Sequence, residues 1–449
     1  MDNPHRDSEE TNDPSRKPIF AGIDYHTKHE PRNLFVLVAH HIALRVGWIF
    51  KTESVIIPYF VDLISGAAWI RGCLPFLNRF GQSVPSLIYA NYLRRSPKKK
   101  RALFWSSFLM AVPFLSLSVV WILVEDKKAI WMPALFLLLY VAFFTFTGIN
   151  QLAYGTLQGK LIRPHRRGRL MGIAGTVGSV PSILCAWFLL RPWVQKDTNA
   201  FDLIFAFTGA GFLVSSIIAL MLAEPTDEID RSTEKKIRLR DYFRDAYLVL
   251  KADKNFRMLC FVAMMTVTSQ MLFPHYQALG REAHSTPTDL VIWVIVQNAA
   301  AGIFSVIAGS IADHYGNRLA LKIQTFFLAF TPLISLAIVH TNIENARALF
   351  WIPFLFLALL PVSFKTFTNY ALELAEPKDH PRYLSTLKVC IALPFVFSPL
   401  VGLFVDHWGF DPVFIAVAIL VGLGSLLTYR LQEPRKHYGS LFTIDAPQD

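Results

Sequence analysis

The sequence has little charge and no recognisable catalytic machinery. Asp, Glu, Lys and Arg make up 17% of its 449 residues, whereas 53% are hydrophobic and the mean hydropathy is +0.38. A soluble globular domain averages about 45–50% apolar residues even when Gly is counted, so this composition excludes one. The Gly-x-x-x-x-Gly-Lys-Ser/Thr loop is absent, which argues against ATP-driven work by this chain alone. Neither a Ser/His/Asp arrangement nor a His-Glu-x-x-His motif is found, so we do not expect an enzyme.

Cysteine is also scarce. The four cysteines all lie inside apolar stretches and show no metal-ligand spacing: Cys73, Cys185, Cys260 and Cys390. We expect them to be small packing residues, with no disulfide, no metal site and no cofactor. The first 30 residues contain no apolar run, so a cleavable signal peptide is not expected, and this segment is predicted to be a disordered cytoplasmic tail.

Long apolar stretches are what the sequence does contain. A membrane-spanning helix needs about 20 mostly apolar residues, and twelve stretches qualify. They are 33–57, 69–93, 102–124, 131–158, 170–191, 201–223, 257–279, 288–312, 319–340, 347–373, 384–404 and 410–430. The first, second and tenth carry charges and are weaker by hydropathy. The prediction is an all-α integral membrane protein with twelve transmembrane helices.

The twelve stretches form two halves built on one plan. Asn150 and Asn369 lie 219 residues apart, near the same end of two spans, and basic loops beginning near residues 94 and 313 share nearly that offset. A repeat this long indicates two pseudo-symmetric six-helix bundles. The predicted boundaries are a tail at 1–32, bundles at 33–223 and 257–430, a cytoplasmic linker at 224–256 and a tail at 431–449.

One loop carries a family resemblance. Gly309, Asp313, Gly316 and Arg318 lie between two apolar spans, and this pattern resembles the loop motif Gly-x-x-x-Asp-Arg/Lys-x-Gly-Arg/Lys-Arg/Lys of the major facilitator superfamily. His314 and Asn317 depart from the basic positions. The resemblance implies two bundles that rock against each other, with spans 2, 5, 8 and 11 at their interface, and an Asp313 that holds a gate on the inner side.

The basic residues set the expected orientation. Lys and Arg gather in the terminal segments and in the loops that follow even-numbered spans, and the net charge is +11. By the positive-inside rule both termini are cytoplasmic. Because the charge lies in short loops between apolar spans, a nucleic-acid partner is not expected. The expected location is the bacterial inner membrane, where the chain would act as a monomer in the lipid bilayer.

Charges inside the membrane point to the substrate. Arg45, Arg79 and Lys365 lie near mid-depth, with no Asp or Glu beside them. Glu53 and Arg71 fall at similar depth farther out and are predicted to form an ion pair. A cation site would need an acid near the midplane, whereas a basic site suits an anion, to which Arg offers a two-pronged donor.

The resemblance adds that spans 1, 4, 7 and 10 should line a central cavity. Arg45, Asn150, Gln270 and Lys365 lie on those spans, and with Arg79 they are the substrate-cavity candidates. An arginine in span 1 is similar to the organophosphate–phosphate antiporters, but those carry a second arginine in span 7, where this chain has Gln270.

The predicted function is secondary active transport of a small solute by alternating access. The solute is expected to be an anion, organic or phosphorylated. Two alternatives remain open. The first is a non-transport protein of the same fold that serves as an assembly factor or sensor; the second is a lipid or drug exporter.

Overall fold

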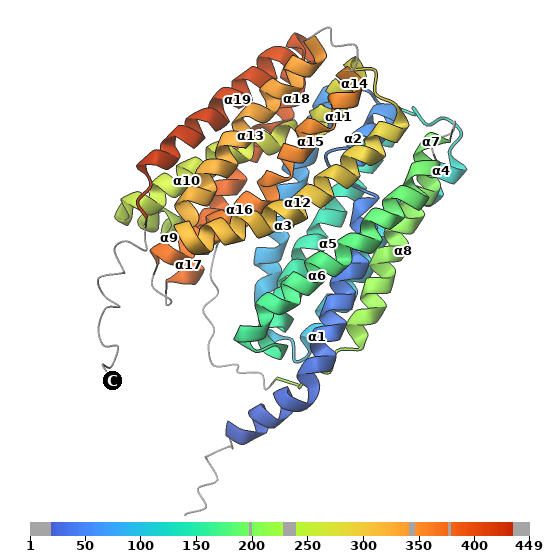
Figure 1. Ribbon diagram of the computed structural model, residues 1–449. Helices are drawn as coiled ribbons and strands as arrows, with labels where there is room; N and C mark the ends of the chain where they lie inside the picture. Colours follow the sequence, from blue (N-terminus) through green and yellow to red (C-terminus); the bar gives the residue numbers. More distant parts are fainter. Residues whose placement is uncertain (1–18, 197–199, 228–238, 341–345, 376–378, 434–449) are drawn as a thin grey trace, which may run out of the picture.

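A computed structural model describes residues 19–196, 200–227, 239–340, 346–375 and 379–433. These residues are almost entirely helical and contain no strand. The helices form two bundles that lie side by side, α1 to α8 in one and α10 to α19 in the other (Figure 1). We call them the N half and the C half.

Six predicted spans correspond to the helices of the N half. Their bounds are α1 (Ile19–Ile49), α2 (Ile56–Ile64), α3 (Ala68–Arg95), α4 (Lys99–Leu123), α5 (Met132–Leu161), α6 (Pro164–Cys185), the π-helical turn η1 (Ala186–Leu190), α7 (Arg191–Gln195) and α8 (Phe201–Leu220). The short connection between α1 and α2 interrupts the first span. The turn η1 joins α6 and α7 into the fifth span.

The C half follows a helix of the predicted linker, α9 (Leu239–Ala252). Its elements are α10 (Lys254–Val267), η2 (Thr268–Leu272), α11 (Phe273–Glu282), α12 (Pro287–Tyr315), α13 (Asn317–His340), α14 (Ala346–Leu349), α15 (Ile352–Leu357), α16 (Leu359–Leu374), α17 (His380–Ala392), η3 (Leu393–Phe397), α18 (Ser398–Trp408), α19 (Phe410–Leu427) and η4 (Thr428–Arg430). The helix α9 packs on α17 and α10.

Two 3-10 turns, η2 and η3, have the same cause. Pro274 has no N–H to donate to the carbonyl oxygen of Gln270, and the N–H of Phe273 donates to that oxygen instead. Pro399 likewise has no N–H to donate to the carbonyl oxygen of Phe395. The N–H of Ser398 donates to that oxygen instead. Each proline therefore tightens its span into a 3-10 turn near the middle.

Ten helical stretches of the described residues are long and apolar enough to cross a membrane. The first and second predicted spans are not among them, and both had been expected to be weaker by hydropathy because of their charges. In the structure α1 packs on α6 and α8, and α3 packs on α5 and α18. Both therefore belong to the same helical assembly as the other ten.

The two halves repeat the same packing. In the N half α1 contacts α6 and α8, α3 contacts α5, and α4 contacts α5 and α8. In the C half α10 contacts α17 and α19, α12 contacts α16, and α13 contacts α16 and α19. These are equivalent pairs of spans, which is the pattern expected from the sequence repeat.

The two ends of the assembly differ in how the halves meet. We call the end with the basic loops around Lys99, Arg166 and Arg318 the basic end, and the opposite one the far end. One apolar core runs through both halves at the far end, whereas at the basic end each half has its own separate cluster. The bundles accordingly converge towards the top of Figure 1, where α2, α7 and α11 lie. The main helix pairs between halves are α3 with α18 and α6 with α12, which are spans 2, 11, 5 and 8.

Candidate functional site

Arg45 and Lys365 approach each other between the two halves. Arg45 is half-buried on α1, one turn before this helix ends at Ile49, and Lys365 is exposed within α16. Their positive charges are close enough to repel each other. Within the described part of the chain, neither has a hydrogen bond or an acidic partner. Gly178 on α6 helps to place the arginine, because a Cβ there would stand 3.3 Å from the Cδ atom of Arg45.

Two adjacent histidines on α1 have different surroundings. His40 is fully buried, and its Nδ1 atom lies 2.8 Å from the carbonyl oxygen of Ser215. His41 is half-buried and interacts electrostatically with both Arg45 and Lys365. His41 was not among the residues predicted for the site, yet it lies beside the two cations, one turn along α1 from Arg45.

Arg79 and Gln270 form a contact between the halves. The Nη2 atom of Arg79 on α3 donates to Oε1 of Gln270 in η2 over 2.6 Å. The guanidinium also lies over the rings of Phe364 and Phe395, at 4.5 and 5.1 Å from their centroids. Three groups of the C half thus hold one cation of the N half. The turn that Pro274 imposes on span 7 is what presents Gln270.

Asn150 is used in helix packing. Its side-chain amide donates to the hydroxyls of Ser106 and Ser107 on α4, over 3.1 and 2.7 Å, and the residue is 3% exposed. Its place on span 4 was predicted to face the cavity, but the side chain points to α4 instead. Asn150 therefore joins two helices of the N half in this conformation.

The predicted ion pair between Glu53 and Arg71 is wrong. Glu53 accepts from Lys51 over 2.7 Å and from the amide of Asn78. Helix α1 ends at Ile49, so residues 50–55 do not continue along the helix axis as the predicted depth of Glu53 required. Glu53 is also near enough to Arg79 to interact with it electrostatically. The expectation that Arg79 has no acid in its range is corrected too.

Arg71 instead takes part in a contact at the far end. It pairs with Asp62 on α2, and the other oxygen of Asp62 pairs with Arg281 on α11. The side chain of Asp62 is 2% exposed, whereas the side chain of Arg281 is 47% exposed. One buried carboxylate of the N half therefore binds an arginine from each half. Asp62 could not be singled out from the sequence, because residues 58–68 were expected to be a loop between two spans.

A second carboxylate also joins the halves, but it belongs to the C half and binds the N half. Both oxygens of Asp406 on α18 accept backbone N–H groups at the first turn of α3, those of Ala68 and Trp69, each over 2.8 Å. An acid suits this position because a helix N-terminus carries partial positive charge. Gly72 and Gly402 let α3 and α18 approach closely beside it.

The loop with the family motif is held by the end of span 12. Gly316 ends α12 with φ +90, and a Cβ there would stand 2.5 Å from the carboxylate of Glu433. The Nη2 atom of Arg318 donates to the carbonyl oxygen of Tyr429 over 2.7 Å. Asp313 is exposed in this conformation, and at Gly309 a Cβ would meet nothing within 4 Å.

The N half has an equivalent arrangement that sequence reasoning missed. Glu224 accepts the N–H groups of Lys99 and Lys100 at the start of α4, over 2.8 and 2.7 Å, and also the ammonium of Lys160. Burial would raise the pKa of nearby Asp227, but hydrogen bonds from Lys160 and Lys99 outweigh it and hold the pKa below its usual value. A signal was available, because a Glu-Pro pair follows both span 6 and span 12.

The comparison with protein families agrees with this geometry. The profile of the Major Facilitator Superfamily matches residues 72–366 and again residues 258–448. The chain belongs to this superfamily. Membership of this superfamily, matched from each half, makes it a membrane transporter of the secondary type and not an enzyme.

Solved structures of the superfamily share the fold at low sequence identity. A D-xylose-proton symporter is 12% identical with a TM-score of 0.66, over 90% of this chain and 98% of its own. A bacterial homologue of the human lysosomal transporter Spinster, inward-facing and unoccupied, is 11% identical with a TM-score of 0.64, over 94% and 99%. The nucleoside transporter NupG is 12% identical with a TM-score of 0.65, over 90% and 100%. No curated protein matches the sequence significantly.

Proposed function

We propose that this transporter moves a small anion, organic or phosphorylated, and that Arg45 and Lys365 bind it between the two halves. The observation that carries the proposal is the approach of these two cations from opposite halves, without an acidic partner among the described residues. Two like charges held near each other repel, and exposure of Lys365 to solvent screens that repulsion only in part. A bound anion would attract both cations and offset their mutual repulsion.

Arg45, Lys365 and His41 would each make a different contact with the anion. Arg45 offers a planar fork that fits a carboxylate or phosphate, and Lys365 adds a point charge from the other side. His41 is near both and can donate a further hydrogen bond. Arg79 has a different role, because its contacts with Gln270, Phe364 and Phe395 bind the N half to the C half in this conformation.

The transport cycle follows from the closed far end. We infer that the basic end is cytoplasmic, as its Lys and Arg content requires, and that this conformation admits solute from that side. Opening the far end would break the contacts of Asp62 with Arg281 and of Asp406 with α3. A D-xylose-proton symporter and a fucose:proton symporter share this fold, which supports a secondary transporter with such a cycle.

A thermal-shift screen on the purified protein tests the proposal. A ligand that binds only the folded state raises the melting temperature, so panels of anionic, neutral and cationic solutes are compared. The expected result is that only anions stabilise the protein. For a stabilising anion, Arg45→Gln should raise Kd about 10- to 100-fold, because hydrogen bonds to charged groups contribute about 1.5–3 kcal/mol. Arg45→Lys should restore part of this loss.

The matched control is Arg191→Gln. Arg191 is a half-buried arginine near the far end. Its guanidinium lies over the ring of Trp187, 4.5 Å from the ring centroid. Its replacement should leave the Kd of the anion unchanged. The anion site would be overturned if neutral or cationic solutes raised the melting temperature and did so equally in the Arg45→Gln variant. Absence of transport in proteoliposomes for every binding solute would favour the sensor or assembly role.

A further inference from the structure

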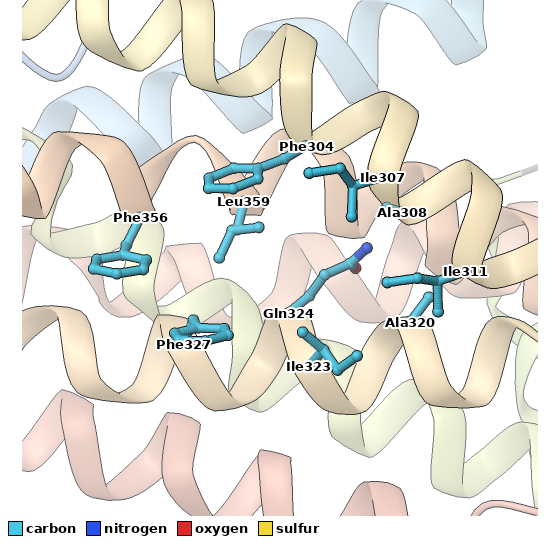
Figure 2. A pocket seen from close by; sticks show the side chains of 10 residues that line it. All are labelled: Phe304, Ile307, Ala308, Ile311, Ala320, Ile323, Gln324, Phe327, Phe356 and Leu359. Atoms are coloured by element: carbon cyan, nitrogen blue, oxygen red, sulfur yellow. The ribbon is translucent and has the colours of Figure 1, made fainter.

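The C half carries a polar pocket at the basic end in addition to an apolar slot. The slot lies between α12 and α13, and its single polar lining residue, Gln324, donates to Thr366 (Figure 2). The polar pocket has a volume of about 460 Å³ and lies where α9 meets α10 and where span 12 ends. We call it the basic-end pocket. Its lining residues are Ala252, Asp253, Lys254, Asn255, Met258, Arg430 and Gln432.

The basic-end pocket contains two cations from two different spans. Lys254 is the first residue of α10, and Arg430 is the last residue of η4, which ends span 12. Both side chains are exposed, and among the described residues neither makes a hydrogen bond or an ion pair. The backbone N–H of Gln432 donates to Oδ1 of Asn255 over 3.2 Å, which holds the two spans together beside the pocket. An anion that enters the pocket therefore meets a positive charge from each span.

The acid in the lining is already used by other groups. Oδ1 of Asp253 accepts the N–H groups of Asn255 and Phe256, each over 2.9 Å, and Oδ2 accepts the hydroxyl of Tyr383 over 3.0 Å. Asp253 therefore caps the first turn of α10 and binds α17. Its carboxylate does not form an ion pair with either of the two cations.

The basic-end pocket lies at the membrane boundary. Span 7 begins at Lys254 and span 12 ends at Arg430, and both are long and apolar enough to cross a membrane. Farther along them Phe261 on α10, and Leu423 and Leu426 on α19, are 49%, 46% and 66% exposed. Side chains exposed on the flanks of such helices face lipid, and headgroups lie where the spans reach water. An occupant can therefore place a charged group in the pocket and acyl chains along α10 and α19, which pack on each other.

We propose that the basic-end pocket binds the headgroup of an anionic phospholipid, with its phosphate between Lys254 and Arg430 and its acyl chains on the exposed flanks of α10 and α19. Arg430 offers a planar fork that matches two phosphate oxygens, Lys254 adds a point charge, and the exposed amide of Gln432 donates a further hydrogen bond. A zwitterionic headgroup carries a cation of its own, which the two basic residues repel. The site therefore prefers phosphatidylglycerol to phosphatidylcholine. The proposal is independent of the solute that the central site takes.

Photolabelling in nanodiscs tests this preference. The full chain is reconstituted in phosphatidylcholine with a small fraction of a probe lipid, either phosphatidylglycerol or phosphatidylcholine with the same diazirine-bearing acyl chain. Labelled peptides are identified by mass spectrometry. We expect labelling of the segments around residues 254–265 and 420–430 to be about fivefold stronger with the phosphatidylglycerol probe, which is the ratio that two exposed ion pairs imply. Equal labelling of these segments by the two probes would overturn the proposal.

Two double variants that lose the same charge locate the effect. Lys254→Gln combined with Arg430→Gln should abolish the preference for the phosphatidylglycerol probe. Arg101→Gln combined with Arg169→Gln removes two exposed cations at the basic end of the N half and should leave the preference unchanged. If the first double variant keeps the preference, or if both lose it equally, the lipid is held by the general positive charge of this end and not by the pocket.

Competition distinguishes a lipid from a free phosphate ester. Unlabelled phosphatidylglycerol in the bilayer should displace the probe from both segments. Soluble glycerol phosphate should not displace it, because it lacks the acyl chains that bury apolar surface on α10 and α19. Displacement by glycerol phosphate would indicate a site for a soluble ester, and that result, or a failure of unlabelled phosphatidylglycerol to compete, would contradict the proposal.

Discussion

The two glycines of the motif loop have different physical roles at the scale of single residues. Gly316 has a positive φ, and a Cβ there would collide with Glu433, whereas Gly309 lies inside α12 with open space around it. Gly316→Ala should therefore lower the free energy of unfolding by at least about 1–2 kcal/mol. Gly309→Ala should raise it by about 0.5–1 kcal/mol, because Ala loses less backbone entropy in a helix.

Denaturant unfolding in detergent measures both variants, and each serves as the control for the other. Equal effects of the same sign would mean that the motif glycines are needed only as small residues. The sequence pattern predicts this loop but does not distinguish the roles of the two glycines. The space at Gly316 is limited by Glu433, which is more than a hundred residues away in the sequence. The error over Glu53 and Arg71 has the same origin: depth along an assumed straight helix does not determine which side chains meet.

At the scale of elements, helix starts at the basic end depend on carboxylates from other spans. Helix α4 has no cap from its own N-cap residue, Lys98, and Glu224 accepts its first N–H groups instead. Glu224→Ala should lower the free energy of unfolding by at least about 2 kcal/mol, because charged hydrogen bonds contribute about 1.5–3 kcal/mol. The exposed Glu125 at the far end is the matched control, and Glu125→Ala should have no effect. If the two variants melt alike, the cap contributes no stability.

Most elements themselves were predictable from the sequence. Twelve spans, the repeat and the helices at the interface between halves follow from apolar length, the 219-residue offset and the family resemblance. What the sequence could not provide is how spans break. The 3-10 turns at Gln270 and Phe395 depend on Pro274 and Pro399, and such prolines are also tolerated in continuous membrane helices.

At the scale of the whole molecule, one asymmetry defines the conformation: a single core joins the halves at the far end, and separate cores lie at the basic end. The crossing of α3 and α18 fixes this state. A Cβ on Gly402 would collide with the carbonyl oxygen of Ala68 and stand 2.6 Å from the Cα atom of Trp69. Gly402→Val should therefore prevent closure of the far end and shift the population towards a state that is open there.

Spin-label distances in nanodiscs test this most directly. One label pair spans the far end, at Lys196 and Ser285, and another spans the basic end, at Arg169 and His314, with the four native cysteines replaced by alanine. We predict that Gly402→Val lengthens the far-end distance and shortens the basic-end distance. Gly422→Val, where a Cβ meets nothing within 4 Å, should change neither. Unchanged distances, or two distances that lengthen together, would contradict rocking of the halves about a central site.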